Sequence, residues 1–266
     1  LAPPVALAPL AGITDLPFRQ LVSRWGAGWV VSEMVASQEM VQAKPGVREK
    51  AELGFDQANT AVQIAGREAY WMAEAARLVE ANGAAFIDIN MGCPAKKVTN
   101  GYSGSALLKD LDHALTLIEA VVAAVKVPVT LKTRLGWDDA LLNAAELAQR
   151  AEGAGIRMIT IHGRTRCQFY KGAADWTAIR RVTEAVSIPV IANGDIDSAK
   201  KAEMVMDFTA ADAIMVGRIA QQRPWIFGQI DHYLSTGKKP EEPTDELKQA
   251  WLLSHLKNLY VFYGEH

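Results

Sequence analysis

Three side chains that can take part in redox chemistry each follow a different short apolar segment of the chain. Cys93 lies in FIDINMGCPAKK, Lys132 in VTLKTR and His162 in MITIHGR. A thiol beside a ring-shaped cofactor can protonate a carbon atom if its pKa leaves it protonated. A buried lysine needs a negatively charged partner, and the anionic edge of a reduced flavin would be one. The thiol and the lysine therefore fit flavin chemistry if the fold brings them together.

Each of these residues also has a structural explanation. A free cysteine is often a small buried hydrophobic residue, so packing alone could explain Cys93, and Cys167 is expected to be inert. His162 alone is explained as well by a hydrogen-bonded core histidine. The position of each residue in the fold has to distinguish these interpretations.

Glycines and an arginine in the last third of the sequence indicate a phosphate site. The segments ANGDI and VGR contain Asn193, Gly194, Asp195, Gly217 and Arg218. Glycines allow backbone N–H groups to approach an anion, and an arginine can bind it with two hydrogen bonds. The alternative is that the glycines only turn the chain and that Arg218 is solvated.

The elements that would position these residues follow a repeated pattern. Eight short apolar, β-rich segments are predicted as strands, and helical periodicity fills most of the intervals. Apolar strands alternating with amphipathic helices are typical of a parallel sheet covered by helices. Eight such units predict an α/β fold of the (β/α)8 TIM barrel type, with an open doubly wound sheet as the alternative. The predicted strands cover residues 5–9, 29–33, 61–66, 86–90, 129–134, 158–164, 190–195 and 213–218.

One interval shows the helical pattern clearly. The segment 70–84 places Met72, Ala75, Ala76 and Val79 on one face and ends at an Asn-Gly pair, which is typical of a helix C-terminus. In a TIM barrel the strand ends and the loops after them form the active site. The polar residues at the ends of the predicted strands are therefore expected to meet at one mouth of the barrel.

Composition and charge limit the possible functions. The 266 residues are 50% hydrophobic, which excludes disorder for most of the chain, and the net charge of -2 means that any nucleic-acid contact must use a local patch. Two cysteines make no disulfide framework, and we find neither a signal-peptide pattern nor an apolar run long enough for a membrane span. We therefore expect a cytoplasmic protein that does not associate with membranes.

Nine motifs occur in an order that resembles a known family. They are APLAGITDLPFR, VSEM, QIAG, DINMGCPAKKV, GSALL, LKTRLGW, TIHGRTR, PVIANGDI and MVGRIAQQRPWIF. From about residue 5 to the C-terminus the chain is similar to the tRNA-dihydrouridine synthases, and most similar to their bacterial B-type branch. The resemblance implies a barrel that binds flavin mononucleotide (FMN), takes electrons from NADPH and reduces the C5–C6 bond of a uridine in tRNA to give 5,6-dihydrouridine. We expect no metal and a monomer.

The resemblance also implies roles for individual residues. Cys93 corresponds to the general acid that protonates C5 after a hydride passes from flavin N5 to C6, and Asn90 to a residue that helps to hold the uracil. The implied flavin contacts are Gln63, Lys132 and His162 at the ring, Ala8, Pro9, Leu10, Ala11 and Gly12 at its edge, and Asn193, Gly194, Asp195, Gly217 and Arg218 at the phosphate and ribityl chain.

A cationic rim for RNA is predicted on loops at the barrel mouth, where an aromatic side chain could contact a base. Its members are Lys96, Lys97, Arg134, Arg164, Arg166, Tyr170 and Lys171. The target uridine would have to leave its stack to enter the barrel.

Two domains are expected. Residues 1–237 would form the FMN-binding barrel, and residues 238–266 a linker and the start of a C-terminal helical tRNA-binding domain. We expect the chain to stop within the first helix of that domain, so that flavin binding does not depend on the missing part but tRNA affinity does. Two alternatives stay open: a flavin barrel acting on a free pyrimidine, of the dihydroorotate or dihydropyrimidine dehydrogenase type, and a non-catalytic RNA-binding relative.

Overall fold

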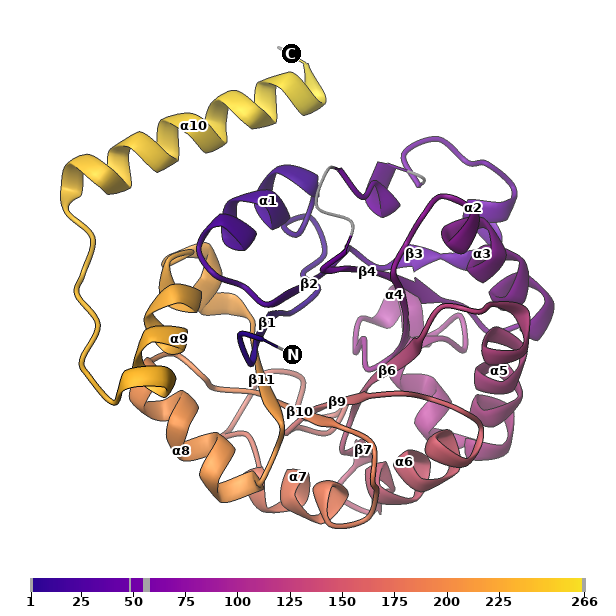
Figure 1. Cartoon of the computed structure of the whole chain (residues 1–266). Coiled ribbons are helices and arrows are strands. Elements are labelled where there is room, and N and C mark those ends of the chain that lie inside the picture. Colours follow the sequence, from indigo (N-terminus) through magenta and orange to yellow (C-terminus); the bar gives the residue numbers. More distant parts are fainter. Residues whose placement is uncertain (1, 48, 55–57, 265–266) are drawn as a thin grey trace.

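A closed ring of eight parallel strands lies at the centre of the computed structural model, which describes residues 2–47, 49–54 and 58–264 (Figure 1). The ring closes because β1 pairs with both β2 and β11, and β2 pairs with β4. The (β/α)8 TIM barrel prediction is confirmed. The strands of the ring are β1 (Val5–Leu7), β2 (Trp29–Val31), β4 (Thr60–Ala65), β5 (Phe86–Met91), β6 (Val129–Arg134), β9 (Ile159–His162), β10 (Val190–Asn193) and β11 (Ala213–Val216).

All eight predicted strands are present, and most end one or two residues before their predicted end. The structure adds three short strands that the sequence pattern did not predict. They are β3 (Val35–Ala36), which extends the pairing of β4, and the antiparallel pair β7 (Gly136–Asp138) and β8 (Leu141–Leu142). Strands of two or three residues are too short to show a period, and the side chain of Asp138 stabilises the β7–β8 turn by accepting from the backbone N–H groups of Ala140 and Leu141.

Helices surround the ring (Figure 1). The α-helices are α1 (Leu16–Arg24), α2 (Ser37–Val41), α3 (Ala69–Ala81), α4 (Lys96–Thr99), α5 (Leu111–Ala124), α6 (Ala144–Gly153), α7 (Trp176–Thr183), α8 (Ala199–Thr209), α9 (Ile226–Thr236) and α10 (Asp245–Tyr263). The 3-10 helices are η1 (Glu49–Ala51), η2 (Gly104–Lys109) and η3 (Arg218–Gln221). The four apolar residues predicted to share a face of α3 are its buried residues, and Gly83 follows this helix with a φ of +90°.

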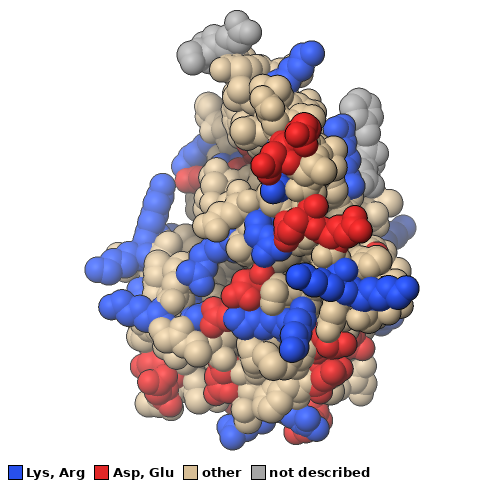
Figure 2. All heavy atoms as spheres, turned by 90° about the vertical axis from the view of Figure 1, so that its left-hand side faces the viewer, with Lys and Arg blue, Asp and Glu red and all other residues tan. Residues whose placement is uncertain are grey.

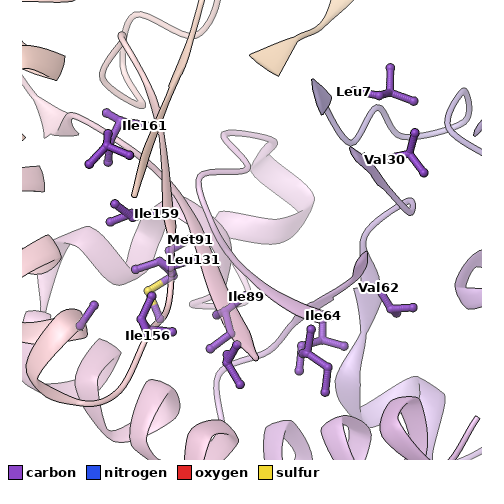
Figure 3. Packing of buried hydrophobic residues seen from close by; sticks show 14 of the residues in the cluster. Leu7, Val30, Val62, Ile64, Ile89, Met91, Leu131, Ile156, Ile159 and Ile161 are labelled. Carbon is purple, nitrogen blue, oxygen red and sulfur yellow. The ribbon is translucent and has the colours of Figure 1, made fainter. Parts of the chain in front are cut away.

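Residues alternate along each strand between two packing layers. Val62, Ile64, Ile87, Ile89 and Leu131 belong to the large apolar cluster between the ring and the helices, and Figure 3 shows several of its members. Smaller buried side chains such as Ala6, Ala61 and Ala213, together with Trp29, form a second cluster inside the ring. The period of two therefore directs Gln63, Asp88, Asn90, Thr130 and Lys132 into the barrel.

The last helix, α10, lies outside the ring beside α1 (Figure 1). Trp251 packs against Trp25, with ring centroids 3.6 Å apart, and Tyr263 Oη donates to Oδ2 of Asp15 (2.9 Å). None of the described residues of α10 is buried, and Leu252 and Val261 are 67% and 82% exposed. None of the helices in the described ranges has the length and apolarity needed to cross a membrane.

Candidate active site

A cavity of about 1020 Å³ opens where the strands of the ring end. The cavity brings together residues that the sequence places up to about 200 positions apart, because the C-terminal ends of all eight parallel strands meet at one mouth. The predicted residues that line it are Ala8, Pro9, Leu10, Ala11, Gln63, Asn90, Cys93, Lys132, Arg134, His162, Arg164, Tyr170, Asn193, Gly194, Asp195, Gly217 and Arg218. Gly12, Lys96, Lys97, Arg166 and Lys171 are not part of its lining.

Gly12 supports the loop that forms one edge of the cavity. Its backbone N–H donates to Oε1 of Glu33 (2.6 Å), and Glu33 is a buried residue that follows β2. The φ of Gly12 is +74°, a conformation that favours glycine. The loop from Pro9 to Gly12 is thereby attached to the neighbouring strand.

Cys93 is half-buried on the loop after β5. Its carbonyl oxygen accepts from the hydroxyl of Ser105 (2.8 Å) and from the backbone N–H of Ser105 (3.1 Å). Gly104 has a φ of +59°, and a Cβ at that position would lie 2.8 Å from the Cys93 carbonyl oxygen. Glycine is therefore required where η2 approaches the cysteine. Cys167 is exposed on another loop and is not part of the cavity lining.

Asn90 holds the backbone on the other side of Cys93. Its Oδ1 accepts from the N–H groups of Gly92 (3.2 Å) and Cys93 (3.0 Å), while its Nδ2 donates to Oε1 of Gln63 (2.8 Å). Gln63 Nε2 donates in turn to Oδ2 of Asp88 (2.7 Å). Asp88 was not predicted as part of this network, although it lies two residues before Asn90 in a mostly apolar strand and so shares its face of β5.

Lys132 is buried in the wall of the cavity. Its Nζ donates to Oδ1 of Asn193 (3.1 Å), and Nδ2 of Asn193 donates to the carbonyl of Met215 (2.8 Å), which fixes the orientation of the amide. Burial, together with the nearby charge of Arg134, lowers the pKa of Lys132 to about 8 despite the attraction of Asp88. Lys132 therefore carries its positive charge at neutral pH.

His162 lies among positive charges. Burial and the charges of Lys132, Arg134, Arg164 and Arg218 lower the pKa of His162 well below its usual value. The imidazole is thus neutral at neutral pH and has one donor and one acceptor nitrogen.

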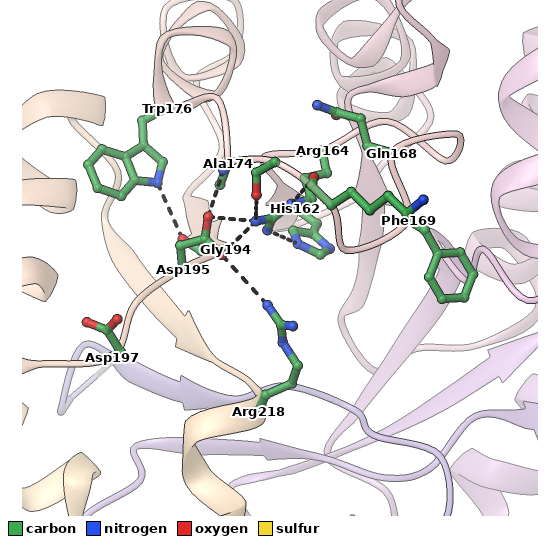
Figure 4. Close-up of polar contacts among 12 residues, drawn as sticks. His162, Arg164, Gln168, Phe169, Ala174, Trp176, Gly194, Asp195, Asp197 and Arg218 are labelled. Carbon is green, nitrogen blue, oxygen red and sulfur yellow. Dashed lines mark hydrogen bonds and ion pairs between the residues drawn. The ribbon is translucent and has the colours of Figure 1, made fainter.

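An ion-pair cluster lies beside the predicted phosphate site (Figure 4). Both carboxylate oxygens of Asp195 accept from Nη2 of Arg164 (2.8 and 2.7 Å), and Arg218 Nη2 lies 3.8 Å from Oδ1 of Asp195. Burial acts to raise the pKa of Asp195, but the hydrogen bonds from Arg164 and the backbone N–H of Ala174 and the charges of both arginines lower it below its usual value. A carboxylate repels a phosphate. Asp195 is therefore better suited to orient these two arginines than to contact the phosphate itself.

Gly194 lies directly before this carboxylate. Its φ is +125°, and a Cβ there would lie 2.8 Å from the Cβ of Ala174. Its carbonyl accepts from Nε1 of Trp176 (3.3 Å) (Figure 4). Arg218 is 58% exposed at its side chain and is therefore accessible to an anion in the cavity.

Two members of the predicted cationic rim, Arg134 and Arg164, line the cavity but are largely buried. Each is 2% exposed. Arg134 donates to the carbonyls of Gly92 (2.8 Å), Thr165 (2.9 Å) and Phe169 (2.8 Å). Arg164 donates to the carbonyls of Lys171 (3.2 Å) and Gly172 (2.6 Å). Both arginines thus hold the loop from 165 to 172, because extended loops leave carbonyls that need donors.

The other members of the rim are accessible. Lys96, Lys97 and Lys171 are exposed, and Tyr170 lies at the mouth with the guanidinium groups of Arg134 and Arg218 at 5.5 and 5.0 Å from its ring. The guanidinium of Arg166 lies 4.6 Å from the ring of Trp137. On the face over α8, α9 and the linker to α10, by contrast, Lys and Arg alternate with Asp and Glu (Figure 2).

Comparisons with known proteins agree with this architecture. A family described as dihydrouridine synthase matches residues 6–266. The chain is 58% identical over 265 residues to a protein of Rhodobacter capsulatus named probable tRNA-dihydrouridine synthase, covering 99% of this chain and 82% of that protein. It is 50% identical over 261 residues to tRNA-dihydrouridine synthase B of Vibrio vulnificus, covering 98% and 81%.

A solved structure shares the fold. Histamine dehydrogenase from Rhizobium sp. 4-9 matches with a TM-score of 0.64 and 14% sequence identity, covering 88% of this chain and 46% of that one.

Within the described ranges, no three His, Cys, Asp or Glu side chains come together in an arrangement that could hold a metal ion.

Proposed function

The chain belongs to the dihydrouridine synthase family, and from this premise we propose that it reduces a uridine of tRNA to 5,6-dihydrouridine, with FMN as cofactor and NADPH as electron donor. The observation that carries the proposal is the meeting of Cys93, Lys132 and His162 in one cavity. The thiol comes from the loop after β5, the buried cation from β6 and the neutral imidazole from β9. Their convergence supports a redox site more than a structural role for each of them alone.

The residues of the cavity fit FMN. The charge of Lys132 would stabilise negative charge on the flavin ring, and the neutral imidazole of His162 would donate one hydrogen bond to it. Backbone N–H groups at Gly194 and Gly217 and the accessible guanidinium of Arg218 would bind the phosphate. When bound, FMN supplies the hydride that is added at C6 of the uracil.

Cys93 lines the cavity, and its thiol could act there as a proton donor. Hydride addition at C6 leaves negative charge on the uracil, and a neighbouring thiol can remove it by protonating C5. Asn90 uses one hydrogen of Nδ2 for Gln63, so the second is free to donate to a uracil carbonyl. We therefore assign Cys93 as the general acid and Asn90 as a residue that both holds the loop and contacts the base.

The tRNA would bind at the cavity mouth. The names of the relatives support tRNA as the substrate, and the exposed charges of Lys96, Lys97 and Lys171 would contact its phosphates, with Arg166 nearby. The target uridine would leave its stack and enter the cavity past Tyr170.

We assign residues 1–237 to the FMN-binding barrel and residues 238–266 to the linker and start of a helical tRNA-binding domain, since α10 lies outside the ring and presents apolar side chains to solvent. We further propose that the protein acts as a monomer in the cytoplasm.

The proposal is tested by supplying the protein with FMN, NADPH and tRNA that lacks dihydrouridine, and by measuring dihydrouridine in the digested RNA by mass spectrometry. The proposal predicts dihydrouridine and NADPH consumption with tRNA, and no NADPH consumption with free uracil or orotate. Turnover of a free pyrimidine without turnover of tRNA would refute it.

A further inference from the structure

A series of hydrogen bonds runs from the barrel interior to the backbone of Cys93. Thr130 Oγ1 donates to Oδ1 of Asp88 (2.6 Å), and Gln63 Nε2 donates to Oδ2 of Asp88 (2.7 Å). Gln63 Oε1 accepts from Asn90 Nδ2 (2.8 Å), and Asn90 Oδ1 accepts from the N–H of Cys93 (3.0 Å). Asp88 is thus connected to the loop that carries the thiol, although the proposed reaction gives it no part.

The loop end of the series determines the direction of each bond. A backbone N–H can only donate, so Asn90 must turn its Oδ1 towards Cys93 and its Nδ2 towards Gln63. Gln63 must then accept with Oε1, which turns its Nε2 towards Asp88. Reversing either amide would place two donors or two acceptors face to face inside the barrel, where an unmade hydrogen bond is most costly. Position 88 therefore has to provide an acceptor.

A carboxylate at this position is costly in itself. Asp88 is 1% exposed, between the apolar residues Ile87 and Ile89. Desolvation raises the pKa of Asp88, although the hydrogen bonds from Gln63 and Thr130 and the charge of Lys132 act to lower it. An apolar side chain would avoid this cost, so a polar task explains the residue better than packing.

We infer that Asp88 is a positioning residue that holds the Gln63 amide in the orientation through which Asn90 fixes the backbone of Cys93, and so sets the place of the thiol in the cavity. The inference rests on the proposed function, because it concerns the group assigned there as the proton donor. The task requires an acceptor and no negative charge. An asparagine meets it, since its Oδ1 can accept from Gln63 while its Nδ2 donates to the Thr130 hydroxyl.

The test measures alkylation of Cys93 by iodoacetamide, with Cys167 in the same molecule as the reference thiol. Mass spectrometry gives the ratio of the two alkylation rates in the wild type and in Asp88→Ala, Asp88→Val and Asp88→Asn. We expect the ratio of Cys93 to Cys167 to rise at least threefold in Asp88→Ala and Asp88→Val, because the loop loses its support. It should stay within twofold of the wild type in Asp88→Asn.

A wild-type ratio in the folded Ala and Val variants would overturn the inference. A ratio in Asp88→Asn as high as in Asp88→Val would show that charge and not the acceptor matters, and would overturn it as well. If neither Ala nor Val variant folds, as judged by near-ultraviolet circular dichroism, Gln63→Leu removes the next link and must raise the ratio; an unchanged ratio there rejects the inference.

This readout needs neither tRNA nor NADPH, so it does not depend on the proposed function. In a second assay, the reduced protein should form dihydrouridine at least tenfold more slowly in Asp88→Val than in the wild type, and within twofold of the wild type in Asp88→Asn. If the wild type forms no dihydrouridine although the alkylation ratios change as expected, the proposed function fails and the positioning of the loop stands.

Discussion

The Nζ of Lys132 donates to Oδ1 of Asn193, and this partner of the buried lysine is a neutral amide. A buried cation was expected to have a negative partner. Asp88 attracts the charge, but burial outweighs that attraction and lowers the pKa of Lys132 to about 8. In the protein without flavin, burial of the charged Lys132 therefore lowers the free energy of unfolding. An anionic cofactor in the cavity would offset this loss of stability.

Replacing Lys132 by methionine should therefore stabilise the protein without flavin. Below pH 8 the ammonium is charged in both the folded and the unfolded state, so the full cost applies; above the unfolded value of 10.5 it is neutral in both, and the cost is absent. The lowering of this pKa from 10.5 to about 8 corresponds to at most about 3 kcal/mol, because Lys132→Met also leaves Oδ1 of Asn193 without its donor. Urea unfolding should show that gain for Lys132→Met at pH 7, shrinking between pH 8 and 10.5, while FMN affinity falls. Equal stability of the two proteins at pH 7 would contradict the burial of a charged lysine.

Cys93→Ala should separate flavin reduction from product formation. The variant should keep its flavin and accept electrons from NADPH, but form dihydrouridine about 100-fold or more slowly, as expected when a general acid is removed. Cys167→Ala is the matched control and should match the wild type, because Cys167 is exposed outside the cavity. Wild-type product formation by Cys93→Ala would remove Cys93 from its assigned role.

Arg218→Ala should weaken flavin binding. A hydrogen bond to a charged group contributes about 1.5–3 kcal/mol, which corresponds to roughly a 10- to 100-fold higher Kd for FMN. The Kd is measured by titrating the flavin-free protein with FMN and following flavin fluorescence. Arg180→Ala is the control, because Arg180 is on α7 and is not part of the cavity lining. Unchanged FMN affinity of Arg218→Ala would place the phosphate elsewhere.

Arg164→Met should destabilise the fold, unlike changes in the exposed rim. The substitution leaves Asp195 without its main partner and the carbonyls of Lys171 and Gly172 without their donor. Removing one member of a buried ion pair costs about 3–5 kcal/mol, and we expect about 3 because Asp195 is 23% exposed at its side chain. Lys97→Ala should leave the unfolding free energy within about 0.5 kcal/mol of the wild type but weaken tRNA binding. Comparable unfolding midpoints for the two variants would refute the loop-holding role.

The sequence predicted the barrel well because its signal is local. Short apolar, β-rich segments such as Val129–Arg134 and the glycines after them indicate strand and loop without reference to the rest of the chain. The cavity residues followed from the rule that parallel strands end at one mouth.

Features that depend on how distant segments meet were not predictable in the same way. The sequence cannot show that Arg134 and Arg164 turn inward to reach the carbonyls of a later loop, because a charged residue after a strand is usually solvated. Nor does the sequence show that Asp88 on β5 lies opposite Gln63 on the adjacent strand β4, since that pairing depends on the register between the two strands.

The central claim is that this chain passes electrons from NADPH to a uridine of tRNA through a flavin in the barrel. The most direct measurement reduces the flavin-loaded protein with one equivalent of NADPH without oxygen, adds tRNA that lacks dihydrouridine, and follows flavin absorbance while dihydrouridine is assayed by mass spectrometry. The account predicts flavin reoxidation with one dihydrouridine formed per flavin reoxidised. The account would be contradicted if NADPH reduced the flavin and orotate or free uracil reoxidised it, but tRNA did not.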